Sequence, residues 1–225
     1  QVDGVRLKET AIGPVPEGWE VGTLRHVLEE VDERAGRSTD GEAIKLPVLS
    51  LTKNEGLVLQ TERFSKRIAT EDVGNYKVVR AGQLVYNPYV IWEGAIHILR
   101  RNEAGLVSPV YPVFAVRLEV ADAHFLDLWL RTPPAIAAYN RYSAGAVNRR
   151  RSIRKRDFFE IQIPLPPLPE QRAIAEMLRA VDRKIQAEEQ RKAELDALFQ
   201  TLLHHLMTGK VRVHLDTITH NGGTP

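Results

Sequence analysis

Residues 165–207 read LPPLPEQRAIAEMLRAVDRKIQAEEQRKAELDALFQTLLHHLM, a proline-rich segment followed by a long run without proline or glycine. The prolines disfavour a helix before this run, because each lacks an amide hydrogen and fixes φ. Most residues after Glu170 are good helix formers, and Gly209 supplies the left-handed stop that a helix end favours. The sequence therefore predicts one helix from Glu170 to Thr208, about 58 Å long.

The apolar residues of this predicted helix recur at alternating spacings of three and four, which is the pattern of a coiled coil. The two series that form the seam are Ile174, Val181, Glu188, Leu195 and Leu202, and Leu178, Ile185, Lys192, Phe199 and Leu206. An amphipathic helix that packs on its own domain is the simpler alternative. The length of the run favours a partner helix, so these ten residues are the predicted dimer interface.

The two charged residues of the seam predict the direction of pairing. If two copies pack antiparallel with the dyad near Gln190, Glu188 of one copy meets Lys192 of the other. A parallel pair in register would instead place like charges opposite each other, which is costly inside a seam. The sequence therefore predicts an antiparallel homodimer with twofold symmetry.

The composition bounds the remaining possibilities. The chain has 225 residues, 43% of them hydrophobic, and a net charge of +2, which suffices for one or two domains with a core and permits nucleic-acid binding. It contains no cysteine, which excludes disulfides and thiolate metal sites and fits a reducing compartment. We find no apolar run of transmembrane length and no signal pattern, so we expect a cytoplasmic protein.

Residues 1–164 predict a globular unit of the α/β (α+β) class with a curled mixed sheet and short helices. Residues 1–18 read as an extended lead-in, and Thr23 as the cap of a helix over residues 24–31. Runs rich in Val, Ile and Tyr predict strands at 44–51, 56–60, 76–79, 83–87, 95–100 and 112–118. Further helices are expected at 124–132 and from Pro134, with a last strand in 158–166. A proline-rich turn and the long helix fill 165–209, and 210–225 is a tail.

Motifs for catalysis are missing from the sequence. The seven histidines have no metal-ligand spacing, and there is no GxSxG elbow, P-loop or GxGxxG. The segment Tyr86-Asn87-Pro88-Tyr89 is similar to the NPPY motif of DNA amino-methyltransferases, but the second proline is absent and no glycine-rich turn precedes it. We therefore expect a turn there, with no catalytic residue, no metal site and no cofactor bound by this chain.

Three groups of residues favour a nucleic-acid surface. The segment 149–156 concentrates arginine, whose planar fork suits phosphates and guanine edges, and a solvated loop is the alternative. A weaker basic group lies within 53–67, and a polar and aromatic turn lies within 86–92, where partly buried packing is the alternative. The predicted DNA-binding residues are Lys53, Asn54, Arg63, Lys66, Arg67, Asn87, Tyr89, Trp92, Arg149, Arg150, Arg151, Arg154 and Lys155.

The segment PLPPLPEQRAIAEMLRAVDRKI, closed by LMTGKVRV, resembles the conserved region of the specificity subunits of Type I restriction-modification systems. IGPVPEGWEVGTL is similar to the start of their target-recognition domains, and the resemblance covers roughly residues 8–213. It implies a subunit without a catalytic centre that reads half of a bipartite DNA target. Methylation subunits with S-adenosylmethionine and an ATP-using restriction subunit would be its partners.

This sequence departs from the family pattern in one respect, and two alternative functions stay open. The family has two recognition domains and two long antiparallel helices, whereas this sequence has one of each, as a half-length subunit or a fragment would. The first rival is a coiled-coil assembly or antirestriction protein that binds the methylation subunits without reading DNA. The second is a stand-alone DNA methyltransferase or nuclease, against which the missing motifs argue.

Overall fold

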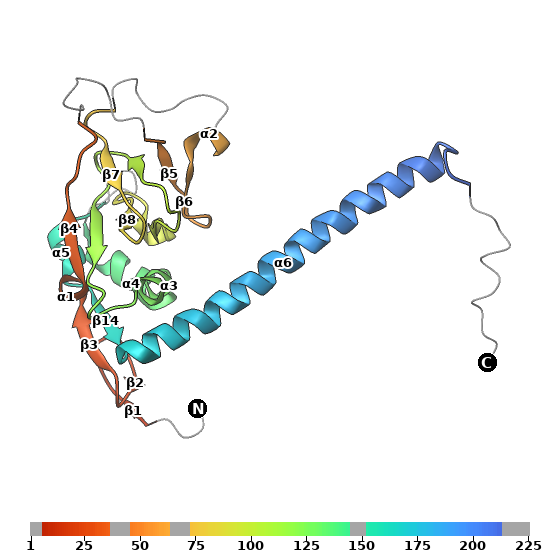
Figure 1. Cartoon of the computed structure of the whole chain (residues 1–225). Coiled ribbons are helices and arrows are strands. Elements are labelled where there is room, and N and C mark those ends of the chain that lie inside the picture. Colours follow the sequence, from red (N-terminus) through yellow and green to blue (C-terminus); the bar gives the residue numbers. More distant parts are fainter. Residues whose placement is uncertain (1–5, 37–45, 64–72, 145–151, 213–225) are drawn as a thin grey trace. The chain divides into compact units, whose positions relative to one another are not determined.

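A computed structural model describes residues 6–36, 46–63, 73–144 and 152–212 (Figure 1). The chain divides into two compact units, Gln1–Ala175 (unit 1) and Glu176–Pro225 (unit 2). Over the described ranges, no helix combines the length and the apolar character that crossing a membrane requires.

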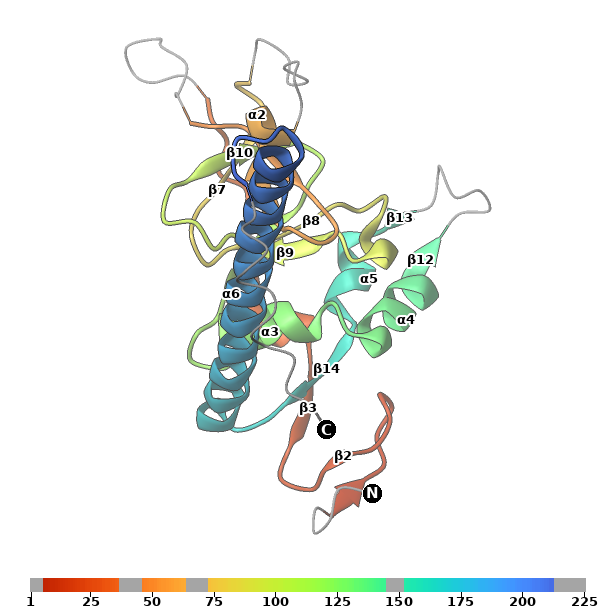
Figure 2. The same ribbon diagram turned by 90° about the vertical axis from the view of Figure 1, so that its right-hand side faces the viewer.

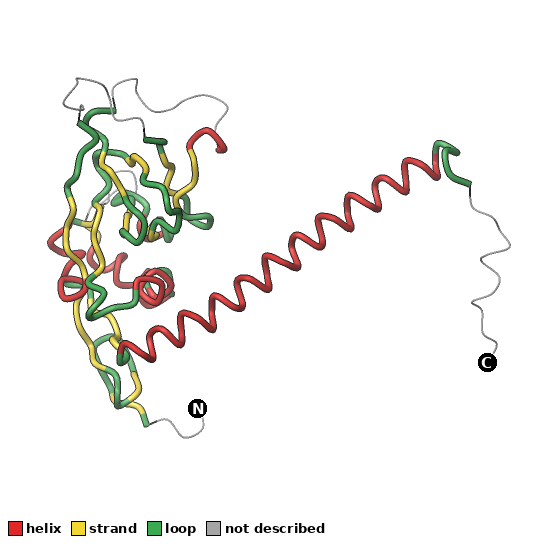
Figure 3. Tube along the Cα trace, in the orientation of Figure 1, coloured by secondary structure: helices red, strands yellow, loops and turns green. Residues whose placement is uncertain are grey.

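Unit 1 is built from small antiparallel sheets, which appear as yellow segments in Figure 3. The largest has the order β4 (Leu28–Val31), β11 (Val113–Val116), β8 (Leu84–Tyr86), β9 (Ile96–Ile98). The two-stranded sheets are β1 (Leu7–Lys8) with β2 (Val15–Pro16), β3 (Glu20–Thr23) with β14 (Gln162–Leu165), β5 (Leu49–Leu51) with β6 (Leu57–Leu59), β7 (Lys77–Val79) with β10 (Gly105–Val107), and β12 (Ser143–Ala144) with β13 (Ser152–Ile153). The α/β class is confirmed, with several small sheets in place of one curled sheet.

Short helices join these strands. They are α1 (Leu24–Val27), α2 (Gln60–Arg63), the 3-10 turn η1 (Ile91–Glu93), α3 (Ala123–Trp129), α4 (Pro133–Tyr142) and α5 (Lys155–Phe159). Asp122 caps α3, where its side chain accepts hydrogen bonds from the amides of His124 and Phe125. Pro133 and Pro134 open α4, at positions whose amides need no helical partner.

The helix predicted over residues 24–31 is wrong in its second half. Leu28–Val31 form β4 and pair antiparallel with Val113–Val116, so the helix ends at Val27. Thr23 makes no side-chain cap hydrogen bond. The apolar spacing of this segment fits a helix locally, but pairing with a distant strand satisfies its backbone and buries Leu28.

An aromatic cluster forms the centre of unit 1. The rings of Tyr86 on β8 and Phe158 on α5 lie 4.4 Å apart, and Phe114 on β11 lies 5.6 Å from Phe158. Tyr139 on α4 completes the cluster at 6.5 Å from Phe158. All four side chains are fully buried, so the core ties the central sheet to α4 and α5.

The predicted long helix is confirmed as α6 (Leu168–Met207), whose 40 residues correspond to about 60 Å. Gly209 follows it with φ of +72°, the left-handed conformation expected of a C-terminal stop. The first turns of α6 belong to unit 1. There the buried side chain of Gln171 accepts from the amide of Asp122 at 2.9 Å and donates to the carbonyls of Val120 at 3.1 Å and Pro166 at 2.9 Å.

The part of α6 in unit 2 exposes its apolar residues. Within the seam, exposure of the apolar side chains runs from 42% at Leu178 to 61% at Phe199. Leu198 and Leu203, at 53% and 43%, widen the apolar stripe towards the end of the helix. Glu188 pairs along the helix with Lys184 at 2.6 Å. Unit 2 therefore carries an apolar surface that nothing within the unit covers among its described residues.

Candidate nucleic-acid interface

Asn87 organises the turn between β8 and η1. Its amide group donates to the hydroxyl of Tyr111 at 3.0 Å, and its side-chain oxygen accepts from the backbone amide of Tyr89 at 3.0 Å. Trp92 packs against the core cluster, whereas Tyr89 is 48% exposed. The exposed ring of Tyr89 is thus the part of this turn best placed to stack on a base.

The strand β13, within the basic segment, lies beside the same turn. β12 and β13 pair through Ser143 with Ile153 and Ala144 with Ser152, next to α4 (Figure 2). The amide of Ile153 also donates to the carbonyl of Pro88 at 3.4 Å. Arg149, Arg150 and Arg151 lie between these strands in the sequence, outside the described residues. The contact of Ile153 with Pro88 places β13 next to the residue that precedes Tyr89.

Arg154 and Lys155 follow β13 and are exposed at the start of α5. Arg154 lies 3.5 Å from a carboxylate oxygen of Asp157, and the ammonium group of Lys155 lies 2.6 Å from Glu30. Exposed ion pairs of this kind contribute little to stability. Both cations therefore remain open to exchange their carboxylate partners for phosphates.

The second predicted group contributes Lys53 and Asn54, which are exposed in the loop between β5 and β6. The carbonyl of Lys53 accepts from the ring Nε2 of His97 at 3.1 Å, which holds the loop against β9. The stem of Lys53 lies near Gly94, where an added Cβ would meet its Cγ at 4.0 Å. The side chain of Arg63 and all of Lys66 and Arg67 lie outside the described residues. Unit 1 thus brings Lys53 close to the turn that carries Tyr89.

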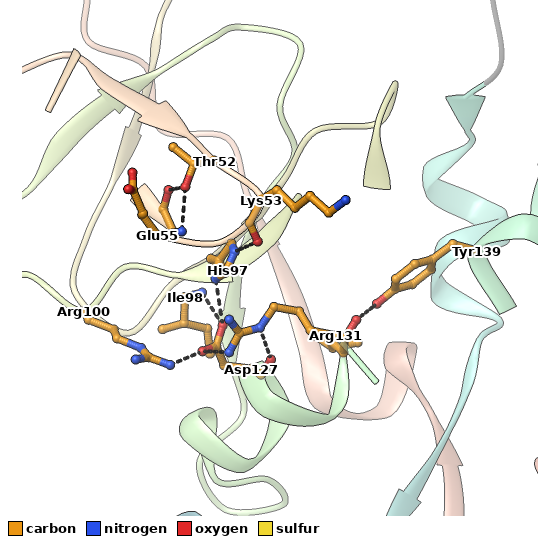
Figure 4. Close-up of polar contacts among 11 residues, drawn as sticks. Thr52, Lys53, Glu55, His97, Ile98, Arg100, Asp127, Arg131 and Tyr139 are labelled. Carbon is orange, nitrogen blue, oxygen red and sulfur yellow. Dashed lines mark hydrogen bonds and ion pairs between the residues drawn. The ribbon is translucent and has the colours of Figure 1, made fainter. Parts of the chain in front are cut away.

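A buried charge network, which the sequence did not predict, lies behind this loop (Figure 4). The carboxylate of Asp127, 1% exposed, accepts from the amide of Ile98 at 2.9 Å and from the guanidinium groups of Arg100 at 2.7 Å and Arg131 at 3.0 Å. Arg131 also donates its Nε to the carbonyl of Asp127 at 3.1 Å. The signal in the sequence is Asp127 within the apolar run HFLDLWLRT, four residues before Arg131.

His97 lies at the edge of this network and is neutral at pH 7. Burial lowers the pKa of its ring below the usual 6.5, the positive charge of Arg131 lowers this pKa further, and Asp127 opposes the shift. Its Nδ1 lies 3.9 Å from Asp127, too far for a strong hydrogen bond. The neutral ring therefore donates from Nε2 to the carbonyl of Lys53 and serves as a link between loop and sheet.

Residues of the network other than Asp127 line a cleft of about 280 Å³. Its polar rim includes Asn54, Glu55, Arg100, Arg101 and Arg131. Gly56 also lines the cleft, with φ of +77°, and faces the His97 ring, which an added Cβ would approach to 3.5 Å. Across the described ranges, no group of three or more histidine and acidic side chains is placed to hold a metal ion. The arrangement suits anion binding.

Comparison with known proteins identifies relatives of this chain. Residues 124–197 match the family model of the Type I restriction modification DNA specificity domain. The chain is 28% identical over 218 residues to a Methanocaldococcus jannaschii protein assigned as the MjaX specificity subunit of a type I restriction enzyme. It is 26% identical over 221 residues to the MjaVIII specificity subunit of the same organism. Each match covers 92% of this chain but 47% and 49% of the relatives.

A solved structure supports the fold. A chain from the structure of a type I R-M system, reported for its complex assembly and conformational transition, aligns with a TM-score of 0.55 at 18% identity. The alignment covers 94% of this chain and 52% of that chain. The protein thus spans about half the length of the curated relatives that it matches. The chain is thus similar to the specificity subunits of Type I restriction enzymes, and its residues 124–197 match the model of their DNA specificity domain.

Proposed function

We propose that this chain is a DNA sequence-recognition subunit of a Type I restriction-modification enzyme. It reads one half of a bipartite target and directs methylation and restriction subunits to it. The observation that carries the proposal is the similarity to specificity subunits, which includes both the globular unit and the long helix over 92% of this chain. Exposed Lys53, Tyr89, Arg154 and Lys155 on unit 1 support DNA contact.

In this proposal two copies supply the two half-sites. Because the chain covers about half of each relative, one copy offers one recognition unit where the relatives have room for two. Pairing through α6 would bury the exposed seam of unit 2 and set the distance between the two readers. In the antiparallel register Ile174 faces Leu206 of the other copy, and Val181 faces Phe199.

The charged break in the seam sets a test for this dimer. On antiparallel pairing Glu188 exchanges its contact with Lys184 for one with Lys192 of the other copy. Glu188→Lys should weaken the dimer about tenfold, and the added change Lys192→Glu should restore it, because opposite charges then face each other again. Sedimentation at several protein concentrations measures both effects. If dimerisation is indifferent to both changes, the seam packs against something else.

The chemistry belongs to the partner subunits in this proposal. The chain itself binds no cofactor and catalyses no reaction, and S-adenosylmethionine and ATP act on the methylation and restriction subunits. Purified chain should therefore neither methylate nor cut DNA. Methyl transfer or Mg²⁺-dependent cleavage by the chain alone would replace this proposal with that of a stand-alone enzyme.

The decisive experiment maps modified adenines. The chain is expressed with its cognate methylation subunit in a host without related systems, and modified positions are read across the host genome. Two identical copies should give a palindromic, gapped motif, because both half-sites are read by the same unit. A non-palindromic gapped motif indicates a second, different recognition domain. Complex formation without any modification and without salt-dependent DNA affinity indicates an assembly protein that does not read DNA.

A further inference from the structure

We propose that the cleft between the β5–β6 loop, β9 and α3 binds a phosphate group through Arg100 and Arg131. We call it the arginine cleft. The assignment of that group to the DNA backbone rests on the proposed function, whereas binding of the phosphate group itself does not. Neither arginine belongs to the basic groups that the sequence indicates.

The arginine cleft has more positive charge than its buried acid can neutralise. Asp127 pairs with both Arg100 and Arg131, at 2.7 Å and 3.0 Å, so one carboxylate serves two guanidinium groups. Arg101 adds a third cation at the rim, and its contact with Glu103 is 3.4 Å long and exposed. Glu55 is the acidic residue at the rim. Asp127 and the charged lining residues together leave a net positive charge that an anion would balance.

The hydrogen bonds to Asp127 orient both guanidinium groups before an anion binds. The carboxylate of Asp127 accepts a hydrogen bond from one terminal nitrogen of each arginine. Its backbone carbonyl accepts a hydrogen bond from the Nε of Arg131. The other terminal nitrogen of each arginine is not used in these bonds. Because Asp127 holds Arg131 by two hydrogen bonds and Arg100 by one, less rotamer entropy is lost when an anion binds than with unattached side chains. A guanidinium group with unused N–H donors beside a cleft can donate two parallel hydrogen bonds to one phosphate group.

Neighbouring residues shape the same cleft. The neutral ring of His97 ties the Lys53 carbonyl to β9, which keeps Asn54 at the rim. Gly56 approaches the ring closely and has a positive φ, so a larger residue there would be strained and would narrow the cleft. Asn54, predicted as a DNA contact, thus lines the arginine cleft, and Lys53 precedes it in the same loop.

A purely structural role for the network makes a different prediction. The amide of Ile98 and the guanidinium of Arg131 already satisfy Asp127, and the Arg131 side chain is 24% exposed. The Arg100 side chain is 52% exposed, so its bond to Asp127 adds little to stability. A structural role therefore predicts that Arg100→Gln changes very little. The proposed role predicts a loss of anion affinity with the fold intact.

The test titrates inorganic phosphate into the full-length chain at constant ionic strength, with chloride as the balancing anion. Backbone amide shifts around Gly56 and Ile98 report binding. Wild type and Arg25→Gln should respond alike, because Arg25 is 57% exposed, pairs with Glu160 and is not part of the cleft. Arg100→Gln should bind phosphate about tenfold more weakly. Glu55→Gln should bind it more tightly, because the opposing charge at the rim is removed.

A second measurement assigns the phosphate to DNA. Binding of a short duplex is followed over a series of salt concentrations, and the salt slope of Arg100→Gln should be smaller by about one than that of Arg25→Gln. If phosphate binding is absent in wild type, or equal in Arg100→Gln and Arg25→Gln, the proposal is wrong. If phosphate binds as expected but wild type has no affinity for DNA, the proposed function fails while the anion site stands. If DNA binds with unchanged slope in Arg100→Gln, the site holds an anion other than the DNA backbone.

Discussion

In unit 1 most of the large apolar side chains are enclosed, whereas in unit 2 the same residue types lie in water. Phe158 is 0% exposed and has four other aromatic rings around it, while Phe199 on α6 is 61% exposed. Both residues are phenylalanines on helices, so residue type alone does not distinguish them. The difference indicates that unit 1 buries its apolar side chains within itself. The apolar side chains of unit 2 become buried only against a second surface.

The largest effect should come from the enclosed ring. Phe158→Ala leaves a cavity between β8, β11, α4 and α5, and we expect it to lower the free energy of unfolding of unit 1 by about 3–5 kcal/mol. All three tryptophans of the chain lie in unit 1, so urea unfolding followed by tryptophan fluorescence reports this unit. A loss below about 1 kcal/mol would mean that the aromatic cluster is not the centre of the core.

The next effect compares two glutamines of the same helix. Gln171→Leu leaves the amide of Asp122 and the carbonyls of Val120 and Pro166 without their partner, which should cost unit 1 about 2–4 kcal/mol. Gln190→Leu removes only an exposed contact with Glu194 and should change stability by less than about 0.5 kcal/mol. Equal effects of the two changes in the same urea experiment would contradict the joint role of Gln171.

The exposed ring of Phe199 should affect association of the chains and leave the stability of unit 1 unchanged. Phe199→Ala removes a large side chain of the seam, and we expect the dissociation constant of the proposed dimer to rise about 10- to 100-fold. Tryptophan-detected unfolding of unit 1 should stay the same. Sedimentation velocity measures the first quantity. A monomeric wild-type chain whose seam remains in water would overturn the comparison between the units.

The smallest effect concerns acid stability. Because burial lowers the pKa of His97, the folded chain keeps this ring neutral while the unfolded chain protonates it near pH 6.5. The stability of unit 1 should therefore fall as the pH decreases below 6.5, until the folded-state pKa is passed. His97→Gln keeps a donor for the Lys53 carbonyl and should flatten this part of the pH dependence. His26→Gln, on the exposed face of α1, serves as the control.

The fold was predictable where the pattern is local. The runs at 56–60, 76–79, 83–87, 95–100 and 112–118 each contain a strand, because β-branched and aromatic residues between turn residues leave few alternatives. The prediction failed at Leu28–Val31, where a distant partner strand decided the conformation. β10 was missed because Gly105–Val107 starts with glycine and offers only two apolar residues before Ser108.

The candidate site was predictable only in part. Charge density in the sequence singled out Lys53, Arg154 and Lys155, and the structure exposes all three. The arginine cleft was not predicted, because Asp127 lies 27 residues from Arg100 and 29 from Ile98 in the sequence. From the sequence alone, a carboxylate in an apolar helix is assigned to the surface, because its partners come from distant segments. Contacts between distant segments are the information that local patterns lack.

The three hydrogen bonds of Gln171 have a consequence for building chimeras. Unit 1, if it is cut at the proline-rich turn, loses the side-chain amide that closes the loop around Val120 and the cap residue of α3. A junction placed after Ala175, where the helix leaves unit 1, keeps this amide with its partners. Exchangeable cassettes made from this chain should therefore carry the first two turns of α6 with the globular unit and take the remaining helix from the recipient.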